Sequence, residues 1–214
     1  MNTMGQQRRR LVMRTTLRTL LAMTLGLLLF LGMPEAARAQ YSFTPIDIPD
    51  ATFTAVNANT THAIAGEFDD ADGVTHGFVL RKGVLTQIDA PDAEGYTSVN
   101  GINAKGDLAG IYFANGRYYG YFWRKGKFTT IDVPDANFVV ANSVNGRGEV
   151  VGFSRKDLEP RHGFLWRKGV LTPIEVPGAS SRGPRISGIN DHRQIVGAYP
   201  DMDNHLHGFL LSKG

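Results

Sequence analysis

The feature that most constrains this chain is a motif that recurs four times at a nearly constant interval. An Ile-(Asp/Glu)-x-Pro tetrad begins at positions 46, 88, 131 and 174, with spacings of 42, 43 and 43 residues. Three further series keep this period: a (His/Tyr)-Gly-(Phe/Tyr) triplet, an apolar residue followed by Gly, and an asparagine at Asn57, Asn103, Asn145 and Asn190. Self-similarity at a fixed period of this length is the sequence signature of a repeat architecture.

Each repeat contains four short segments of β character. In the second copy these are residues 97–103, 107–113, 119–124 and 127–133. They are rich in Val, Ile, Phe, Tyr and Thr, and Gly, Asn or Pro bounds them, as is typical of strands joined by tight turns. Four strands in a repeat of about 40 to 50 residues match a propeller blade. We therefore predict that residues 40–214 form one all-β domain, a small four-bladed β-propeller of four-stranded blades.

The two ends of the repeat array indicate how the ring closes. The chain ends at the turn that follows a third segment, whereas residues 41–46 have the pattern of a fourth segment. We predict that the N-terminal and C-terminal strands pair in one blade, because closure removes exposed sheet edges that invite aggregation. A dimer that pools eight blades is the alternative closure, and an open stack of repeats is the alternative without closure.

Residues 1–39 have the features of a secretory signal peptide. Five arginines lie between positions 8 and 18, an apolar run covers residues 19–33, and Ala37-Arg38-Ala39 offers a cleavage site before Gln40. The apolar run has 15 residues, fewer than the roughly 20 that a membrane-spanning helix needs. We predict an exported protein, extracellular or periplasmic, with no transmembrane span in the mature chain. Retention of the leader as an anchor is the alternative.

The charge balance of the mature chain argues against a nucleic-acid partner. The whole chain has 23 Lys+Arg and 20 Asp+Glu. Removal of the leader takes away six of the positive residues and one of the negative ones, which leaves 17 against 19 and a net charge of −2. The basic character therefore belongs to the leader, and overall charge gives no reason to expect nucleic-acid binding. The chain has no cysteine, so burial of apolar surface must stabilise it without disulfides.

The repeat landmarks also resemble a known family. The His-Gly-Phe, Gly-Ile-Asn, Val-Gly and Ile-Asp-x-Pro patterns are similar to those of the HAF extracellular repeat family of exported bacterial proteins. The resemblance covers nearly all of residues 41–214, with departures at Tyr119 and at His192, where glycine is usual. It implies export and repetition, and it implies no reaction, cofactor or catalytic residue.

The blade topology predicts two faces with different roles. The turns between the first and second segments and between the third and fourth segments share one face, here called the turn face. The remaining connections share the opposite face, here called the loop face. Counting charges predicts a basic turn face and an acidic loop face. The loop face varies most between copies, and variable loops on a rigid scaffold commonly carry binding sites. The candidate ligand-binding residues there are Asp70, Asp72, His76, His162, Asp201, Asp203 and His207.

Two groups of these residues suggest metal chemistry, and each has a simpler interpretation. Asp70, Asp72, Asp201 and Asp203 alternate like the first ligands of a calcium loop, but Asp and Asn also satisfy backbone amides in acidic turns. His76, His162 and His207 would suggest zinc, but a ring would place them on different blades. We favour structural turns and structural histidines, and we predict neither a bound metal nor a cofactor.

These observations favour a non-enzymatic exported module that binds a cell-surface, polysaccharide or protein partner through the loop face, as a monomer or a dimer. A carbohydrate-active enzyme is one alternative, and it predicts carboxylates with perturbed pKa values converging in one cleft. A structural repeat that acts as a spacer is the other.

Overall fold

The computed structural model describes residues 42–212, which contain fifteen β-strands and no helix. This confirms the all-β prediction for these residues. The chain divides into two units, Met1–Pro45 and Ile46–Gly214, and the fold below is that of the second unit. The predicted signal peptide, residues 1–39, lies outside the described residues. Across residues 42–212, nothing forms a helix long and apolar enough to cross a membrane.

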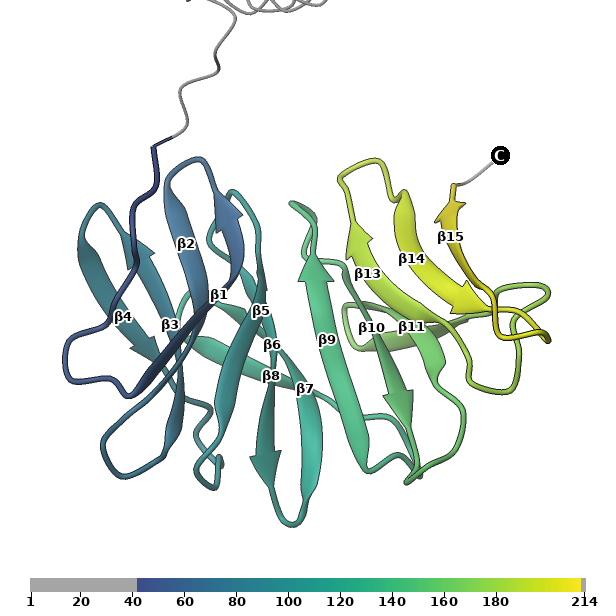
Figure 1. The fold of residues 1–214 in the computed structure, drawn as a ribbon, viewed down its shortest axis with the longest axis horizontal. Helices are drawn as coiled ribbons and strands as arrows, with labels where there is room; N and C mark the ends of the chain where they lie inside the picture. Colours follow the sequence, from purple (N-terminus) through teal and green to yellow (C-terminus); the bar gives the residue numbers. More distant parts are fainter. Residues whose placement is uncertain (1–41, 213–214) are drawn as a thin grey trace, which may run out of the picture. The chain divides into compact units, whose positions relative to one another are not determined.

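The strands form three sheets, of four, eight and three strands, and the eight-stranded sheet joins two repeats through one parallel pair, Tyr118 with Phe138. Each repeat contributes one antiparallel group of strands, here called a blade (Figure 1). Blade 1 contains β1 (Phe53–Thr60), β2 (Ala63–Asp69), β3 (Thr75–Arg81) and β4 (Val84–Ile88). Blade 2 contains β5 (Thr97–Ile102), β6 (Leu108–Ala114), β7 (Arg117–Arg124) and β8 (Lys127–Ile131). Blade 3 contains β9 (Phe138–Val144), β10 (Val150–Arg155), β11 (His162–Arg167) and β12 (Val170–Ile174). Blade 4 contains β13 (Arg185–Ile189), β14 (Ile195–Pro200) and β15 (Leu206–Leu211).

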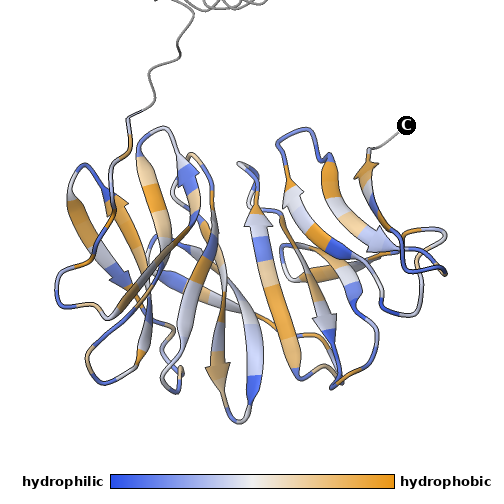
Figure 2. Ribbon diagram, in the orientation of Figure 1, coloured by the Kyte–Doolittle hydropathy of each residue, from blue (hydrophilic) through white to orange (hydrophobic). Residues whose placement is uncertain are grey.

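The third and fourth strands of each complete blade are joined by a two-residue turn. Both central residues have positive φ in Lys82-Gly83, Lys125-Gly126 and Lys168-Gly169. This is the type I′ geometry, whose twist matches that of the flanking strands. The prediction of a tight turn at Lys125-Gly126 is confirmed. Figure 2 shows that the apolar residues concentrate in the strands, whereas the turns and loops are mostly hydrophilic.

Each first strand carries a β-bulge at one repeat position, occupied by Asn57, Asn100, Asn142 and Ser187. This corrects the asparagine series of the sequence analysis, because Asn57 corresponds to Asn100 rather than to Asn103. Thr60 holds the position of Asn103: its Oγ1 accepts a hydrogen bond from the amide of Ala63 at 3.1 Å, as Asn103 Oδ1 does from the amide of Asp107 at 3.0 Å. The first repeat has a shorter turn here, which hid the register.

Successive blades are joined because the first strand of each blade packs on the blade before it. The residue before the bulge is fully buried in the later blades, at Val99, Ala141 and Ile186. Each of these side chains lies against a glycine of the preceding blade, respectively Gly77, Gly120 and Gly163, where an added Cβ would come within 2.8 to 3.5 Å of it. Glycine is required here because only a side chain of hydrogen lets the next strand approach so closely.

The predicted pairing of the N-terminal and C-terminal strands is wrong for the described residues. No strand of residues 42–212 precedes β1, and β15 pairs with β14 alone. The four repeats therefore form an open series of blades rather than a closed four-bladed ring. The other fourth strands follow their third strands through two-residue turns, so they pair locally. An N-terminal fourth strand would have to pair with the far end of the chain, which costs loop-closure entropy.

Candidate functional site

The predicted loop-face residues of blade 1 form one hydrogen-bonded turn. Asp70 Oδ1 accepts from the amides of Asp72 and Val74, each at 2.9 Å, and Asp70 Oδ2 lies 3.1 Å from His76 Nε2. His76 Nδ1 lies 3.0 Å from Asp89 Oδ1. The histidine is thus held between two carboxylates. Burial lowers its pKa, but the hydrogen bonds to Asp70 and Asp89 outweigh that effect and the pKa is raised.

Blade 4 repeats this arrangement. Asp201 Oδ1 accepts from the amides of Asp203 and His205 at 2.9 Å, and its Oδ2 lies 2.8 Å from His207 Nε2. The hydrogen bond from His207 is the first cause of a lowered pKa for Asp201. Both aspartates thus satisfy their own loops, as the structural interpretation of the sequence predicts.

The structure does not bring the predicted residues into one site. His76, His162 and His207 stand on β3, β11 and β15, in three different blades. One group of three potential ligands occurs among the described residues, Asp201, Asp203 and His205, whose donor atoms lie within 4.8 Å of one another. Two of these three side chains are exposed, and the Asp201 carboxylate already accepts from two amides and a histidine. Asp70 and Asp72 have no such third neighbour.

Two buried carboxylates lie on the turn face and are paired with arginines. Asp107 accepts from Arg124 Nε and Nη2, both at 2.8 Å, and these bonds are the first cause of its lowered pKa. Glu149, 2 % exposed, accepts from Arg193 of blade 4. Burial raises the pKa of Glu149, but Arg193 and Asn145 lower it by more. Both carboxylates are therefore held ionised.

A cavity of the loop face lies where blades 3 and 4 meet, and none of its arginines was predicted as a site residue. Its volume is about 670 Å³. Three connections contribute to its wall: the loop from β10 to β11, the loop from β12 to β13 and the loop from β14 to β15. The cavity, here called the arginine cleft, is lined by four arginines and one acidic residue: Arg155, Arg161, Arg182, Arg185 and Glu159.

Backbone hydrogen bonds fix these loops against one another. The amide of Arg161 donates to the carbonyl of Arg182 at 3.1 Å, and the amide of Ser180 donates to that of Pro200 at 2.7 Å. Gly183 permits the first contact: its φ is +67° and an added Cβ would lie 1.8 Å from the carbonyl oxygen of Arg161. Glycine is the residue that adopts this left-handed conformation without steric cost. The cleft is thus built by the scaffold.

The guanidinium groups of the cleft are crowded and only partly satisfied. Arg155 Nε is buried and has no hydrogen-bond partner within residues 42–212. The pKa of the Arg161 guanidinium is lowered, first by burial and then by the charges of Arg185, Arg155 and Arg182. Like charges in one cleft repel, and a buried donor without an acceptor costs free energy.

A row of aromatic side chains leads from blade 2 to the arginine cleft. Ring centroids are 5.0 Å apart for Phe113 and Tyr118, 5.1 Å for Tyr118 and Phe138, and 6.1 Å for Phe138 and Phe153. Arg155 lies over the Phe138 ring at 4.7 Å and Arg161 over the Phe153 ring at 5.6 Å. All four rings are half-buried. The aromatic row and the arginine cleft thus form one continuous strip.

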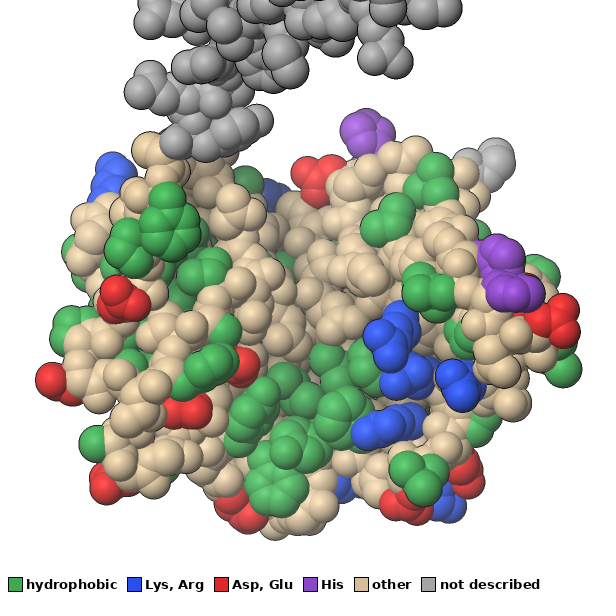
Figure 3. All heavy atoms as spheres, in the orientation of Figure 1, with side chains coloured by type: hydrophobic (Ala, Val, Ile, Leu, Met, Phe, Trp, Pro, Cys, Tyr) green, Lys and Arg blue, Asp and Glu red, His purple; other side chains and the backbone are tan. Residues whose placement is uncertain are grey.

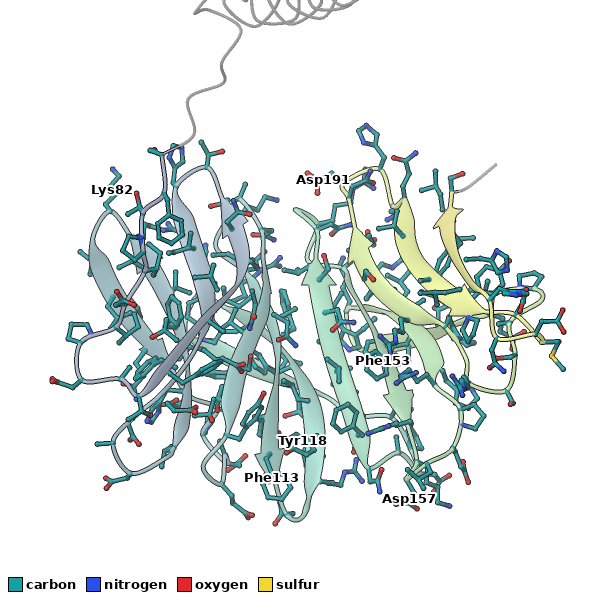
Figure 4. All side chains as sticks on the ribbon, in the orientation of Figure 1. Lys82, Phe113, Tyr118, Phe153, Asp157 and Asp191 are labelled. Carbon is teal, nitrogen blue, oxygen red and sulfur yellow. The ribbon has the colours of Figure 1, made fainter. Side chains whose placement is uncertain are left out.

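Figure 4 labels three of the four rings of the aromatic row, Phe113, Tyr118 and Phe153. In Figure 3 a group of Lys and Arg side chains lies beside a group of hydrophobic side chains. In Figure 4 Lys82 and Asp191 lie at one end of the blades, and Phe113 and Asp157 lie at the opposite end, which agrees with the predicted turn face and loop face. The prediction of an acidic loop face is wrong at the junction of blades 3 and 4, where four arginines gather.

Comparisons with known proteins give structural likenesses alone. No family model and no curated protein matches the chain. Two similar solved structures are of a variant of Aleuria aurantia lectin, one with α-methyl-L-fucoside and one with Fucα1-6GlcNAc. Each has 15 % identity and a TM-score of 0.45, and the match covers 71 % of this chain and 53 % or 54 % of the other. A variant of AofleA from Arthrobotrys oligospora has 10 % identity and a TM-score of 0.44, covering 75 % and 52 %. The chain thus spans about half the length of these structures.

The arginine cleft was not predicted from the sequence, because charges were summed over a whole face. Arg155, Arg161, Arg182 and Arg185 lie in the connections that follow β10 and β12 or at their borders, whereas four of the other five loop-face connections each contain two aspartates. A count for each connection would have found the cluster. The aromatic row gave no such signal, because its members come from different repeat positions.

Proposed function

We propose that this chain is an exported, non-catalytic module that binds an acidic polysaccharide in the arginine cleft. The observation that carries the proposal is the gathering of four arginines around one cavity with a single acidic side chain, one guanidinium nitrogen being buried without a partner. The proposed export rests on residues 1–39 and on the resemblance to the HAF repeat family.

The guanidinium group fits a particular kind of anion. Its planar array of N–H donors matches the two oxygens of a carboxylate or sulfate, and such charge-assisted bonds are stronger than neutral ones. Arg155 lines the cleft, and its buried Nε has no partner among the described residues. Arg182 and Arg185 are exposed at its border, where they can meet an incoming ligand. The cleft therefore suits a ligand with a carboxylate or sulfate group.

The aromatic row favours a polymer of sugars over a small free anion. The rings of Phe138 and Phe153 lead directly out of the cleft, since Arg155 and Arg161 stack on them. An aromatic ring offers a flat apolar face, and the C–H groups of a pyranose ring form a matching apolar face. A chain of acidic sugars would place one charged group among the arginines and neighbouring rings along the row.

The enzyme alternative requires a carboxyl group that stays protonated to act as a general acid. The carboxyl groups with shifted pKa values are Asp70, Asp107, Glu149 and Asp201, and every one of these shifts is downward. They are held ionised by histidines, arginines or backbone amides. These four groups are therefore unsuited to that role, and the cleft carries the binding proposal instead.

The test is the binding of polygalacturonate, dextran sulfate and neutral dextran by protein purified after expression of the full chain. We expect binding of one or both acidic polymers and none of dextran, with weaker binding as salt rises because exposed charges are screened. The double variant Arg182→Glu/Arg185→Glu should lose at least about tenfold in affinity, or about 1.4 kcal/mol. Its matched control, Lys82→Glu/Lys127→Glu, makes the same charge change on the turn face.

Three results would overturn the proposal. One is binding of neutral dextran as tight as that of the acidic polymers, which would exclude recognition of the charge. Another is an equal loss of affinity in the control variant, which would indicate a general charge effect. The third is a lack of binding to both acidic polymers.

A further inference from the structure

The two ends of the blade series present complementary surfaces. Every internal junction pairs an apolar side chain of a first strand with a glycine of the preceding blade: Val99 with Gly77, Ala141 with Gly120 and Ile186 with Gly163. The corresponding side chain of blade 1 is Val56, which is 45 % exposed, whereas its three equivalents are fully buried. The corresponding glycine of blade 4 is Gly208, where the one neighbour of an added Cβ is a carbonyl oxygen 3.9 Å away.

The surface around Gly208 repeats the pattern of the occupied junctions. Val196 pairs across the sheet with Leu210, as Ala65 pairs with Val79 and Ala109 with Phe122. Ala65 and Ala109 are fully buried beneath the next blade, whereas Val196 is 46 % exposed. Leu210 is 60 % exposed. In blade 4, the apolar face that a neighbouring blade covers elsewhere is therefore exposed to solvent.

Main-chain hydrogen bonds at the junctions repeat as well. The amides of Thr75, Tyr118 and Arg161 donate to the carbonyls of Gly95, Asn137 and Arg182 in the next blade, at 3.1, 3.0 and 3.1 Å. The donors stand two residues before the junction glycine, so the equivalent donor in blade 4 is the amide of Leu206. The acceptors stand four residues before the apolar residue, so the equivalent acceptor in blade 1 is the carbonyl of Thr52. Both the apolar contact and the polar contact therefore have matching halves at the two ends.

We propose that blade 4 of one copy of this chain docks on blade 1 of a second copy, with the second copy's Val56 seated against Gly208. The junction would be the fourth of its kind, built from the same positions as the three internal ones. A second copy fits as the occupant because its Val56 is exposed and holds the position that Val99, Ala141 and Ile186 hold in the three internal junctions. Closure within one chain would have to alter the packing of those junctions.

Two copies related by a two-fold axis would form this junction twice and close on themselves, whereas further copies would extend the series. The closed dimer is isologous as a whole, whereas an extended series is heterologous, and in both arrangements each junction joins blade 4 of one copy to blade 1 of another. The two positions that the test substitutes, Val56 and Gly208, do not line the arginine cleft, although Leu206, whose amide the junction would use, does.

The test is the mass of the protein in solution, measured by light scattering and by sedimentation equilibrium over a range of concentrations. We expect the parent protein to associate into dimers or longer species. Gly208→Val should keep the fold, because an added Cβ meets open space, and should prevent association by filling the socket. Val56→Lys should do the same from the other end. Val170→Lys is the control, since Val170 is 63 % exposed on an outer strand and should associate like the parent.

A mixing experiment tests the head-to-tail geometry. A Val56→Lys chain retains an intact blade 4, and a Gly208→Val chain retains an intact blade 1. The mixture should therefore form a heterodimer through one junction, although each variant alone is a monomer. Thermal unfolding of each variant checks that it is folded. A monomeric parent protein, association that survives both substitutions, or variants that stay monomeric when mixed would each overturn the proposal.

Discussion

Arg193, in the turn after β13, reaches across a blade junction to Glu149 of blade 3, with Nε 2.9 Å and Nη2 2.8 Å from Glu149 Oε1. Asn145 donates to the other carboxylate oxygen, Oε2, at 2.8 Å. This buried carboxylate therefore ties blade 4 to blade 3. The arginine cleft lies at the other end of the same junction, so the contact between Arg193 and Glu149 helps to hold together the two blades that form the cleft.

Replacement of Glu149 should loosen this junction. Glu149→Gln keeps the size of the side chain but removes the charge that Arg193 binds, and we expect a loss of about 2 kcal/mol in the free energy of unfolding, as for a hydrogen bond to a charged group. Urea denaturation measures the loss. Glu175→Gln, at an exposed position, is the control and should change stability by less than about 0.5 kcal/mol. Equal stability of the two variants would contradict the role of the pair.

Acid should destabilise the protein through Asp107 and Glu149. Their pKa values are lowered in the folded state from ordinary values of 3.8 and 4.5, so the unfolded state binds protons more readily. The stability that they contribute is complete above those ordinary values and is lost as pH falls through the lower folded values. The melting temperature measured from pH 6 down to about pH 3 should fall, and less so in Glu149→Gln. An identical acid profile in that variant would contradict this account.

His76 of blade 1 should titrate above its ordinary pKa of 6.5. Only the protonated ring donates from both nitrogens, and so satisfies Asp70 and Asp89 together. Its contribution to stability is present below pH 6.5 and is lost as pH rises through the raised folded pKa. In Asp89→Asn the NMR-detected pKa of His76 should fall, because one acceptor charge is gone. Asp135→Asn, on a different blade, should leave it unchanged, and an unchanged value in Asp89→Asn would refute the assignment.

The glycines that receive the next blade should tolerate substitution only at the open end. In Gly163→Ala the new Cβ would lie 2.8 Å from Ile186 Cγ1, and overpacking of this kind costs about 1 to 3 kcal/mol. In Gly208→Ala the added methyl group meets open space, so stability should change by less than about 0.5 kcal/mol. Calorimetry on dilute protein measures both. Similar costs at the two positions would contradict the junction geometry.

Much of the fold could be predicted from the sequence because the repeat imposes it. The period, the four strands and the turn at Lys125-Gly126 follow from local chemistry. The register of the first repeat could not be predicted, because Thr60 replaces the asparagine at Asn103 by supplying an equivalent hydroxyl oxygen. The open series could not be predicted either, because pairing of chain ends depends on the rotation between successive blades rather than on any local pattern.

Less of the candidate site than of the fold could be predicted, because the site depends on tertiary structure. The sequence correctly indicated that Asp70 and Asp201 serve their own turns, because alternating acidic residues in a short loop bind backbone amides. It could not indicate that Arg155 and Arg185 line one cavity, because the blade junction brings their two loops together. A binding site on the loop face stays a prediction, and the acidic charge expected on that face was wrong at this junction.

The most direct test of the acidic-polysaccharide proposal is an NMR titration of the arginine side chains with polygalacturonate. The Arg155 Nε–H group is buried and has no partner among the described residues, so an acidic sugar in the cleft should shift its resonance and slow its exchange with water. Arg124, which Asp107 already satisfies on the turn face, should not respond. Shifts at Arg155 that saturate with the polymer and are absent with neutral dextran are the predicted result. An unchanged Arg155 resonance under conditions in which the polymer binds would contradict the account.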